Sequence, residues 1–367
     1  MKVKWFVCIG ITAIGSGICS AGPMPSFRGI GELAGGDAYS NARGVSADGS
    51  FVVGFSYSAS GKEAILWSNG TGLVGLGANT SATGVSSDGK AVAGSWGSTA
   101  ARWTEGSGWV SIGTLSGYSG SHATDISDDG NVVVGYAGNL MAFRWNEAEG
   151  IVNMGTLGGT FSSANGVSAD GSVIVGYSNH GNTAHDDAFR WTEATGMVGL
   201  GDVPGGTRSY GYGVSADGAY VVGYATDYSS GTDTWWDAFL WHESTGMISL
   251  GELPGGDPKA LAQDVSLDGS AVVGYSYSDS GLEAFLWDPE NGMRGMKSVL
   301  TTDYGLDLSG WTLSVAQAIS DDGRVIVGYG RNPSGNTEGW IATVPEPGSA
   351  ALLVFTALAL VRRRRRA

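Results

Sequence analysis

The chain has 367 residues, of which 63 are glycine, but the glycines follow no Gly-X-Y period, and this excludes a collagen-like triple helix. Acidic residues outnumber basic ones by 35 to 20, giving a formal net charge of −15, and the arginines bunch at the extreme C-terminal end. The basic footprint of a nucleic-acid-binding protein is therefore absent. Cys8 and Cys19 both lie near the start of the chain, so neither disulfides nor cysteine-based sites are expected beyond that segment.

The first residues have the order of a secretory signal peptide. Lys2 and Lys4 precede an apolar stretch over residues 5–14, and small residues follow, with Ala21 as the expected cleavage point. A lipoprotein anchor at Cys19 is an alternative, although Ile18 stands where a small residue is usual. The sequence therefore predicts export, with residues 1–21 as the signal peptide.

An Asp-Gly turn recurs along the rest of the chain. It is followed each time by an apolar run that ends in glycine five residues later, a variable spacer and a second apolar run. The turn glycines are Gly49, Gly89, Gly130, Gly171, Gly218, Gly269 and Gly323, and the later glycines are Gly54, Gly94, Gly135, Gly176, Gly223, Gly274 and Gly328. Several short strands in a repeat of this length are typical of a β-propeller. A linear β-solenoid is the alternative.

The fourth repeat illustrates the strands that we expect in each unit. Residues 164–168 form strand a, and Asp170-Gly171 form a two-residue hairpin turn. Residues 173–177, 188–192 and 197–201 form strands b, c and d. The predicted fold is thus all-β, a seven-bladed β-propeller of four-stranded antiparallel blades.

The two ends of the repeat array complement each other. Residues 27–36 align with residues 197–206, so an unattached strand d precedes the first repeat, whereas the last repeat has strands a, b and c only. Pairing residues 27–32 with residues 338–343 closes the ring and removes two open sheet edges. This complementarity favours the propeller over the solenoid.

The strand c motif resembles the bacterial extracellular repeats named HAF. It reads Ala142-Phe143-Arg144-Trp145 in the third copy, and Ala188-Phe189-Arg190-Trp191 is the next. The resemblance implies an exported repeat protein spanning residues 22–343, and it carries no catalytic motif. We expect the repeated tryptophans, with Trp340 as the seventh, to be wedges between blades.

The C-terminal segment, residues 344–367, resembles a PEP-CTERM sorting signal, also called the ice-binding protein C-terminal domain. Its three parts are the motif Val344-Pro345-Glu346-Pro347, an apolar run over residues 350–361, and the basic cluster Arg362, Arg363, Arg364, Arg365 and Arg366. The resemblance implies a short transmembrane helix, with exosortase and the secretion machinery as partners. A plain tail anchor has the same topology and differs only in whether the tail is later cut.

The b–c and d–a loops vary in length, and so the face that carries them is the candidate binding face. The candidate ligand residues in these loops are aromatic, acidic or histidine side chains: His180, His185, Tyr228, Asp233, Trp235 and Trp236. Flat rings beside carboxylates suit sugar rings and their hydroxyl groups. The alternative is that the rings pack only against their own loops.

We expect no catalytic residue, no metal and no cofactor. Asp125 and Asp264 begin segments that resemble half a calcium loop but lack the required glutamate, and His180, His185 and Asp186 share a loop without regular metal-ligand spacing. The predicted function is a cell-surface or matrix interaction module, with extracellular polysaccharide as candidate ligand. The alternative is a polysaccharide hydrolase or lyase on a propeller scaffold, with Asp125 and Asp264 as the nearest candidates.

Overall fold

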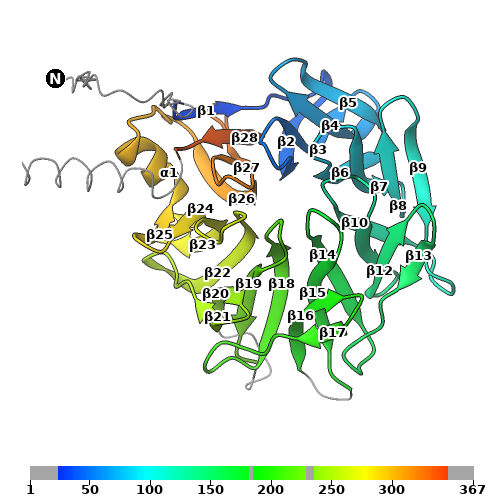
Figure 1. Cartoon of the computed structure of the whole chain (residues 1–367). Coiled ribbons are helices and arrows are strands. Elements are labelled where there is room, and N and C mark those ends of the chain that lie inside the picture. Colours follow the sequence, from blue (N-terminus) through cyan, green and yellow to red (C-terminus); the bar gives the residue numbers. More distant parts are fainter. Residues whose placement is uncertain (1–23, 182–184, 229–234, 346–367) are drawn as a thin grey trace, which may run out of the picture.

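The computed structural model describes residues 24–181, 185–228 and 235–345. Within these ranges the strands form four-stranded antiparallel units around a common centre, which is the architecture of a β-propeller (Figure 1). The predicted signal peptide and the predicted apolar run and arginine cluster lie outside the described residues. In the part of the chain that is described, no helix has the length and apolar character needed to cross a membrane.

The units follow one another along the chain. The first two are β2 (Gly35–Val45), β3 (Phe51–Ser58), β4 (Gly61–Ser68), β5 (Gly72–Ala78) and β6 (Thr80–Val85), β7 (Ala91–Trp96), β8 (Thr99–Thr104), β9 (Gly108–Gly113). The next two are β10 (Ser121–Ile126), β11 (Val133–Ala137), β12 (Met141–Asn146), β13 (Gly150–Asn153) and β14 (Ser162–Val167), β15 (Val173–Asn179), β16 (Asp186–Thr192), β17 (Gly196–Gly199).

The later units follow the same pattern. They are β18 (Arg208–Val214), β19 (Tyr220–Thr226), β20 (Trp236–His242), β21 (Gly246–Ser249) and β22 (Gly255–Val265), β23 (Val272–Ser278), β24 (Gly281–Asp288), β25 (Gly292–Gly295). The last contains β26 (Thr312–Ile319), β27 (Val325–Arg331) and β28 (Thr337–Thr343), and its fourth strand is β1 (Ser26–Gly29).

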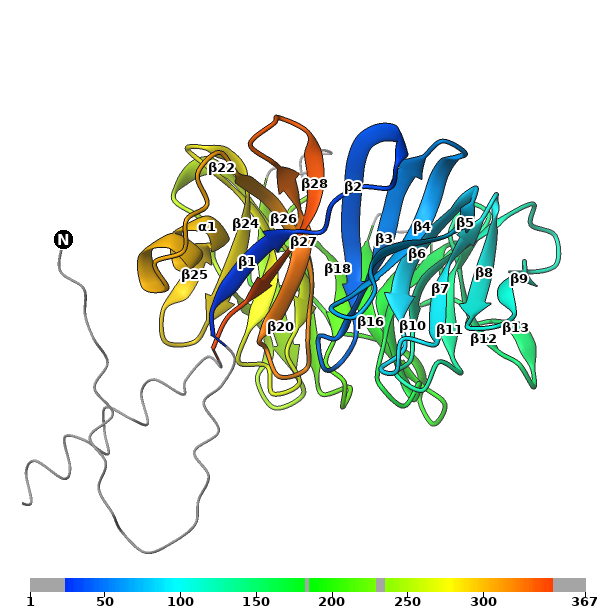
Figure 2. The same cartoon turned by 90° about the horizontal axis from the view of Figure 1, so that it is seen from above.

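The pairing of β1 with β28 joins the two ends of the array, as the sequence predicts (Figure 2). The strands run antiparallel, from Ser26 opposite Thr343 to Gly29 opposite Trp340. The amide of Ile30 then donates to the carbonyl oxygen of Gly339 at 2.9 Å. Because β1 pairs with the edge of β28, the last unit has four strands like the other units.

The Asp-Gly turns are wider than the predicted two-residue hairpins. In the fourth repeat the amide of Gly171 donates to the carbonyl of Ser168, and Gly171 has a φ of +71°. The hydroxyl of Ser168 donates to Asp170 Oδ1 at 2.8 Å and accepts the amide of Val173 at 2.9 Å. The Ser168 and Asp170 side chains therefore provide hydrogen-bond partners inside the turn. These bonds stabilise a loop that is longer than the predicted two-residue hairpin.

Hydrophobic clusters lie between neighbouring units. One of them joins Val134 and Ala142 of the third unit to Ile174 and Phe189 of the fourth, with Trp191 packed against its edge. The largest fully buried side chains in strand c include the phenylalanines of the HAF-like motif, namely Phe143, Phe189, Phe239 and Phe285. The phenylalanine, rather than the tryptophan, therefore fills the centre of these interfaces.

Trp340 does not occupy the tryptophan position of the repeat, and on this point the sequence alignment is wrong. Each strand b glycine lies opposite the phenylalanine position, as Gly176 lies opposite Phe189, and Gly328 lies opposite Trp340. Trp340 is 0% exposed. The last repeat thus uses tryptophan as its central plug, because Ala342 stands where the other repeats place their tryptophan.

Every inner strand contains a β-bulge opposite the strand b glycine. In the fourth unit Ala164 pairs with Gly176 and Gly166 pairs with Val175, so Asn165 is the extra residue. A Cβ added at Gly176 would collide with the carbonyl oxygen of Ser163, and the equivalent glycines meet the equivalent carbonyls. The bulge therefore explains why glycine recurs at a constant distance from the turn.

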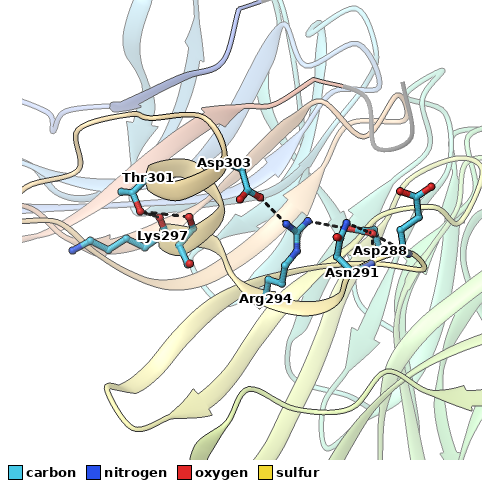
Figure 3. A network of polar contacts seen from close by, with 8 residues as sticks. Asp288, Asn291, Arg294, Lys297, Thr301 and Asp303 are labelled. Atoms are coloured by element: carbon cyan, nitrogen blue, oxygen red, sulfur yellow. Dashed lines mark hydrogen bonds and ion pairs between the residues drawn. The ribbon is translucent and has the colours of Figure 1, made fainter. Parts of the chain in front are cut away.

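A helical insertion connects β25 to β26 and contains α1 (Met296–Ser298) and η1 (Val299–Asp303). Arg294 holds it by contacting Asp288 Oδ2 at 2.7 Å and Asp303 Oδ2 at 2.6 Å (Figure 3). Lys297 Nζ donates to the carbonyl oxygen of Trp311 at 2.6 Å, and Trp311 packs edge-on against Phe27 of β1. The insertion therefore supports the unit in which the chain ends meet.

Replacing Gly176 by alanine is expected to lower the free energy of unfolding by about 1–3 kcal/mol, because the new methyl group forces the Ser163 carbonyl to move. Denaturant unfolding measures the change. Gly70→Ala is the matched control, since its added Cβ meets only Ser68 Oγ at 3.9 Å. Equal effects of the two substitutions would contradict this explanation of the glycine.

Candidate functional site

A central cavity of about 510 Å³ runs between the inner strands. The extra residue of each strand a bulge lines it, and in every copy that residue is polar: Arg43, Thr83, Thr124, Asn165, Tyr212, Gln263 and Gln317. A bulge interrupts the two-residue alternation of a strand and turns one additional side chain toward this face. The cavity wall is therefore polar although the strands are mostly apolar.

Three of these bulge side chains tie neighbouring units together. Thr83 and Thr124 donate to the carbonyls of Ala123 and Ala164 at 3.2 and 2.9 Å. Asn165 Nδ2 donates to the carbonyl of Gly211 at 2.7 Å. By contrast, the side chains of Gln263 and Gln317 make no hydrogen bond to any residue in the described ranges, so their amide groups face the cavity with their bonding capacity unused.

Asp125 and Asp264 both line the cavity, and each carboxylate bridges two units. Asp125 accepts the amides of Ile126 and Val167 at 2.8 and 3.0 Å. Asp264 likewise accepts the amides of Val265 and Ile319 at 2.8 and 2.9 Å. Burial raises the pKa of each carboxyl to about 7, against the lowering effect of these hydrogen bonds.

The turn end of the cavity is acidic. Asp128 and Asp321 line it beside the Asp-Gly turns, and burial followed by the charge of Asp128 raises the pKa of Asp321 to about 6. Backbone hydrogen bonds link the turns, because Asp128 donates to Ala169 and Asp321 donates to Ala47. Backbone hydrogen bonds therefore hold the wall at this end of the cavity, and its negative charge disfavours the binding of anions.

We define a tyrosine belt as the residues that directly follow the strand b glycine, toward the end of strand b away from the Asp-Gly turn: Tyr136, Tyr177, Tyr224, Tyr275 and Tyr329. Of these, Tyr329 lines the cavity, as the bulge residue Tyr212 also does. All five rings are half-buried. Burial raises the pKa of Tyr275 to about 12, so its hydroxyl stays protonated at neutral pH. The recurrent Gly-Tyr pair is the sequence signal that would have found this belt.

Ring contacts connect the belt to the cavity wall and to one predicted ligand residue. Tyr210 lies between Tyr177 and Tyr224, with ring centroids 5.0 and 4.8 Å away. Tyr224 in turn contacts the cavity-lining Tyr212 at 6.1 Å and Trp236 at 5.3 Å. Trp236 thus continues a row of rings that leads to the cavity.

The other predicted ligand residues lie around the same blade interface. Trp235 packs against the apolar cluster that contains Val175 and Phe239. The guanidinium of Arg208 covers the Tyr228 ring, with its carbon 3.6 Å from the ring centroid. Asp233 lies outside the described residues. The structure therefore places Tyr228, Trp235 and Trp236 in one region, where each of them also contacts the protein itself.

The sequence grouped His180, His185 and Asp186, but the structure gives these three side chains different partners. His180 Nε2 contacts Asp187 Oδ2 at 2.9 Å, whereas Asp186 accepts the Tyr210 hydroxyl at 2.8 Å. His185 instead lies near Asp187 and Asp202, with one ligand atom from each within 4.8 Å of the others. Among the described residues these three form the group whose ligand atoms lie close enough together to hold a metal ion, and this combination does not appear in the sequence pattern.

The start of the predicted sorting motif belongs to the propeller. The amide of Val344 donates to the carbonyl of Arg324 at 2.8 Å, and Val344 is part of the apolar cluster that contains Trp340. Pro345 is the last described residue. Glu346, Pro347 and the arginines 362–366 lie outside the described residues.

No family model matches the chain. No curated protein matches it. The oligogalacturonate lyase from Vibrio parahaemolyticus has a TM-score of 0.59 at 10% identity, over 88% of this chain and 98% of that one. An oligogalacturonate lyase in complex with manganese has a TM-score of 0.55 at 12% identity, over 88% and 97%.

TolB from Acinetobacter baumannii is 14% identical with a TM-score of 0.45; the match covers 84% of this chain and only 64% of that TolB chain. At such identities the likeness to the two lyases concerns the fold alone, and it supports the β-propeller.

The carboxyls of Asp125 and Asp264 are expected to titrate near pH 7, against about 4 for an exposed aspartate. Because the folded chain holds protons that the unfolded chain releases, these groups make the free energy of unfolding fall as the pH rises from about 4 to 7. Carboxyl NMR titration measures both midpoints. Asp170 is the internal control, since hydrogen bonds from Ser172 and Ser168 hold its pKa below the usual range. Midpoints near 4 for Asp125 and Asp264 would contradict the buried, cavity-wall environment.

Proposed function

We propose that the protein is an exported surface or matrix protein that binds extracellular polysaccharide without catalysing a reaction. The observation that carries this proposal is the tyrosine belt beside a cavity that Tyr212 and Tyr329 line and whose wall presents the unbonded amides of Gln263 and Gln317. Aromatic rings stack on the apolar faces of sugar rings, and amides pair with sugar hydroxyls.

The belt is suited to this role because a neighbouring ring outside the belt, Tyr210, holds one of its members, Tyr224, in place. Tyr210 and Tyr224 stack on each other with an interplanar angle of 16°, and the hydroxyl of Tyr210 is fixed by Asp186. Side chains that are ordered before binding lose little conformational freedom when a ligand arrives. The belt lies toward the face of the variable b–c loops, which is also the face that the sequence favours.

The proposal takes the ring as seven blades, one for each Asp-Gly turn, closed by the N-terminal strand. The support is that each turn joins the first two strands of one four-stranded unit, and that β1 completes the unit that begins with β26. One polar bulge residue from each unit then faces a shared cavity. A ligand at the mouth thus meets side chains from several repeats.

A polysaccharide hydrolase or lyase remains the second candidate. It is favoured by Asp125 and Asp264, which line one cavity and have a pKa near 7, with the charge of Asp125 contributing to the shift of Asp264. Each carboxylate is, however, engaged by two backbone amides. Depolymerisation that is lost in Asp125→Asn or Asp264→Asn, with the melting temperature retained, would favour the enzyme.

Substituting Tyr212 by alanine is expected to weaken binding to the extracellular polysaccharide of the source organism by about tenfold, the equivalent of ~1.4 kcal/mol. Affinity electrophoresis of the secreted protein measures the change, and circular dichroism checks the fold. Leu267→Ala is the control, because Leu267 is an exposed side chain of the opposite, turn-bearing face. Unchanged retention of the Tyr212 variant, or equal loss in both variants, would count against the tyrosine-lined mouth as the site.

The proposed export route makes a separate prediction. If an exosortase cleaves the sorting signal, the intact mass of the extracellular protein should lack residues 1–21 and about 20 residues at the C-terminus, the length of a spanning helix. Replacing Arg362 to Arg366 by glutamine should reduce this processing, since the basic cluster orients the segment. A full-length cytoplasmic product would overturn the route without bearing on sugar binding.

A further inference from the structure

Two cations share one aromatic ring, and one of them, Arg43, lines the central cavity. Arg43, the bulge residue of β2, lies with its guanidinium carbon 4.8 Å from the centroid of Phe55, and Lys62 Nζ of β4 lies 4.2 Å from the same centroid. Neither side chain forms an ion pair or a hydrogen bond with any residue in the described ranges. In a chain with a net charge of −15, two adjacent cations without an acidic partner require an explanation.

This arrangement is unfavourable in the unliganded protein. Burial lowers the pKa of Arg43, and burial followed by the charge of Arg43 lowers the pKa of Lys62. The groups that raise the pKa of Arg43 against this burial are the hydroxyls of Tyr39 and Tyr329, rather than carboxylates. Like charges that are partly removed from water and not paired cost free energy, which an incoming anion recovers.

A third group next to Arg43 lacks a partner as well. Asn41 is only 6% exposed, lines the same cavity, and its Oδ1 atom is buried without a hydrogen-bond partner among the described residues. A buried acceptor that no protein donor reaches is costly unless a ligand or water supplies the donor. Asn41 and Arg43 belong to the same strand and line the same cavity, so both residues are available to one ligand there.

We propose that Arg43, Lys62 and Asn41 form a subsite for the carboxylate of an acidic sugar residue, a uronate, within the polysaccharide. The planar guanidinium of Arg43 pairs with the two carboxylate oxygens, and Lys62 adds a second positive charge. Asn41 Oδ1 accepts a hydrogen bond from a hydroxyl of the same sugar, and Tyr39 and Tyr329 flank the group. This subsite rests on the proposed function and names the class of polysaccharide.

The charges elsewhere in the cavity restrict where the anion can lie. Asp125, Asp128, Asp264 and Asp321 all line the cavity. After burial, the charge of Asp125 raises the pKa of Asp264, and that of Asp128 raises the pKa of Asp321. A carboxylate deeper in the cavity would meet these groups. The uronate carboxylate is therefore held at the Arg43 side of the mouth, while neutral parts of the chain contact the tyrosine belt.

The test compares three soluble polymers by isothermal titration calorimetry with the secreted protein: polygalacturonate, the same polymer with its carboxyl groups reduced to alcohols, and dextran sulfate. We expect polygalacturonate to bind at least about tenfold more tightly than its reduced form, the value of one charge-assisted hydrogen bond. Arg43→Gln and Lys62→Gln should each remove this difference. Lys90→Gln is the matched control, since it deletes one exposed positive charge beside an Asp-Gly turn.

The outcomes separate the subsite from the function on which it rests. Equal binding of the acidic and reduced polymers, unaffected by Arg43→Gln, overturns the subsite and leaves sugar binding intact. Tighter binding of dextran sulfate than of polygalacturonate overturns the choice of a carboxylate. If no polymer binds, a titration with acetate that follows the NMR signal of the Arg43 Nε–H group tests the subsite alone. A saturable shift of this signal that is absent in Lys62→Gln supports an anion subsite without the polysaccharide. No shift of the signal refutes both the subsite and the polysaccharide binding. Arg43→Lys, which keeps the charge, guards against loss of binding through misfolding.

Discussion

The close approach of the strand a bulge to the strand b glycine is the contact on which the rest of the structure depends. At each unit a carbonyl of the inner strand occupies the space that a side chain on strand b would need. The bulge adds one residue to the inner strand, and that residue turns toward the centre of the ring. A constraint on backbone packing thus supplies the polar lining of the cavity.

The side chains at the bulge positions either connect neighbouring units or line the cavity, and the residue type differs between these two roles. Threonine and asparagine at this position bond to the next unit and hold the ring together. Arginine, tyrosine and glutamine are longer and reach into the cavity instead. Because a repeat protein varies one position many times on a constant framework, it can assign some copies to stability and leave others to a ligand.

The distribution of charge gives the cavity a direction. The turn end carries aspartates that the surrounding structure partly buries, whereas the opposite end carries tyrosines and the Arg43–Lys62 pair. The carboxylates of the turn aspartates accept hydrogen bonds from neighbouring serines and backbone amides. These aspartates therefore stabilise the loops rather than attract cations. The two cations have no such local partner. The asymmetry follows from which side chains lie at each end of the cavity, not from the net charge of the chain.

The amino-acid sequence by itself determined the repeat, the place of the turns, the recurrent glycine and the pairing of the chain ends. These features are local or periodic, and they recur in each repeat. A pattern that is present in every copy can be distinguished from a chance match in one of them. The bulge was not foreseen, because one extra residue breaks the alternation on which strand prediction relies. For the same reason the polar ring, the tyrosine belt and the position of Trp340 were missed or misplaced.

Only the tertiary structure decided which side chains meet. Asp125 reaches the amide of Val167 and Asp264 that of Ile319, across 42 and 55 residues of sequence. His185 joins Asp187 and Asp202 rather than Asp186, and Arg43 meets Lys62 through the ring of Phe55, which lies on a third strand. Contacts between blades depend on how far each strand lies from the centre of the ring and on the direction in which its side chains point. The order of residue types along the chain specifies neither of these.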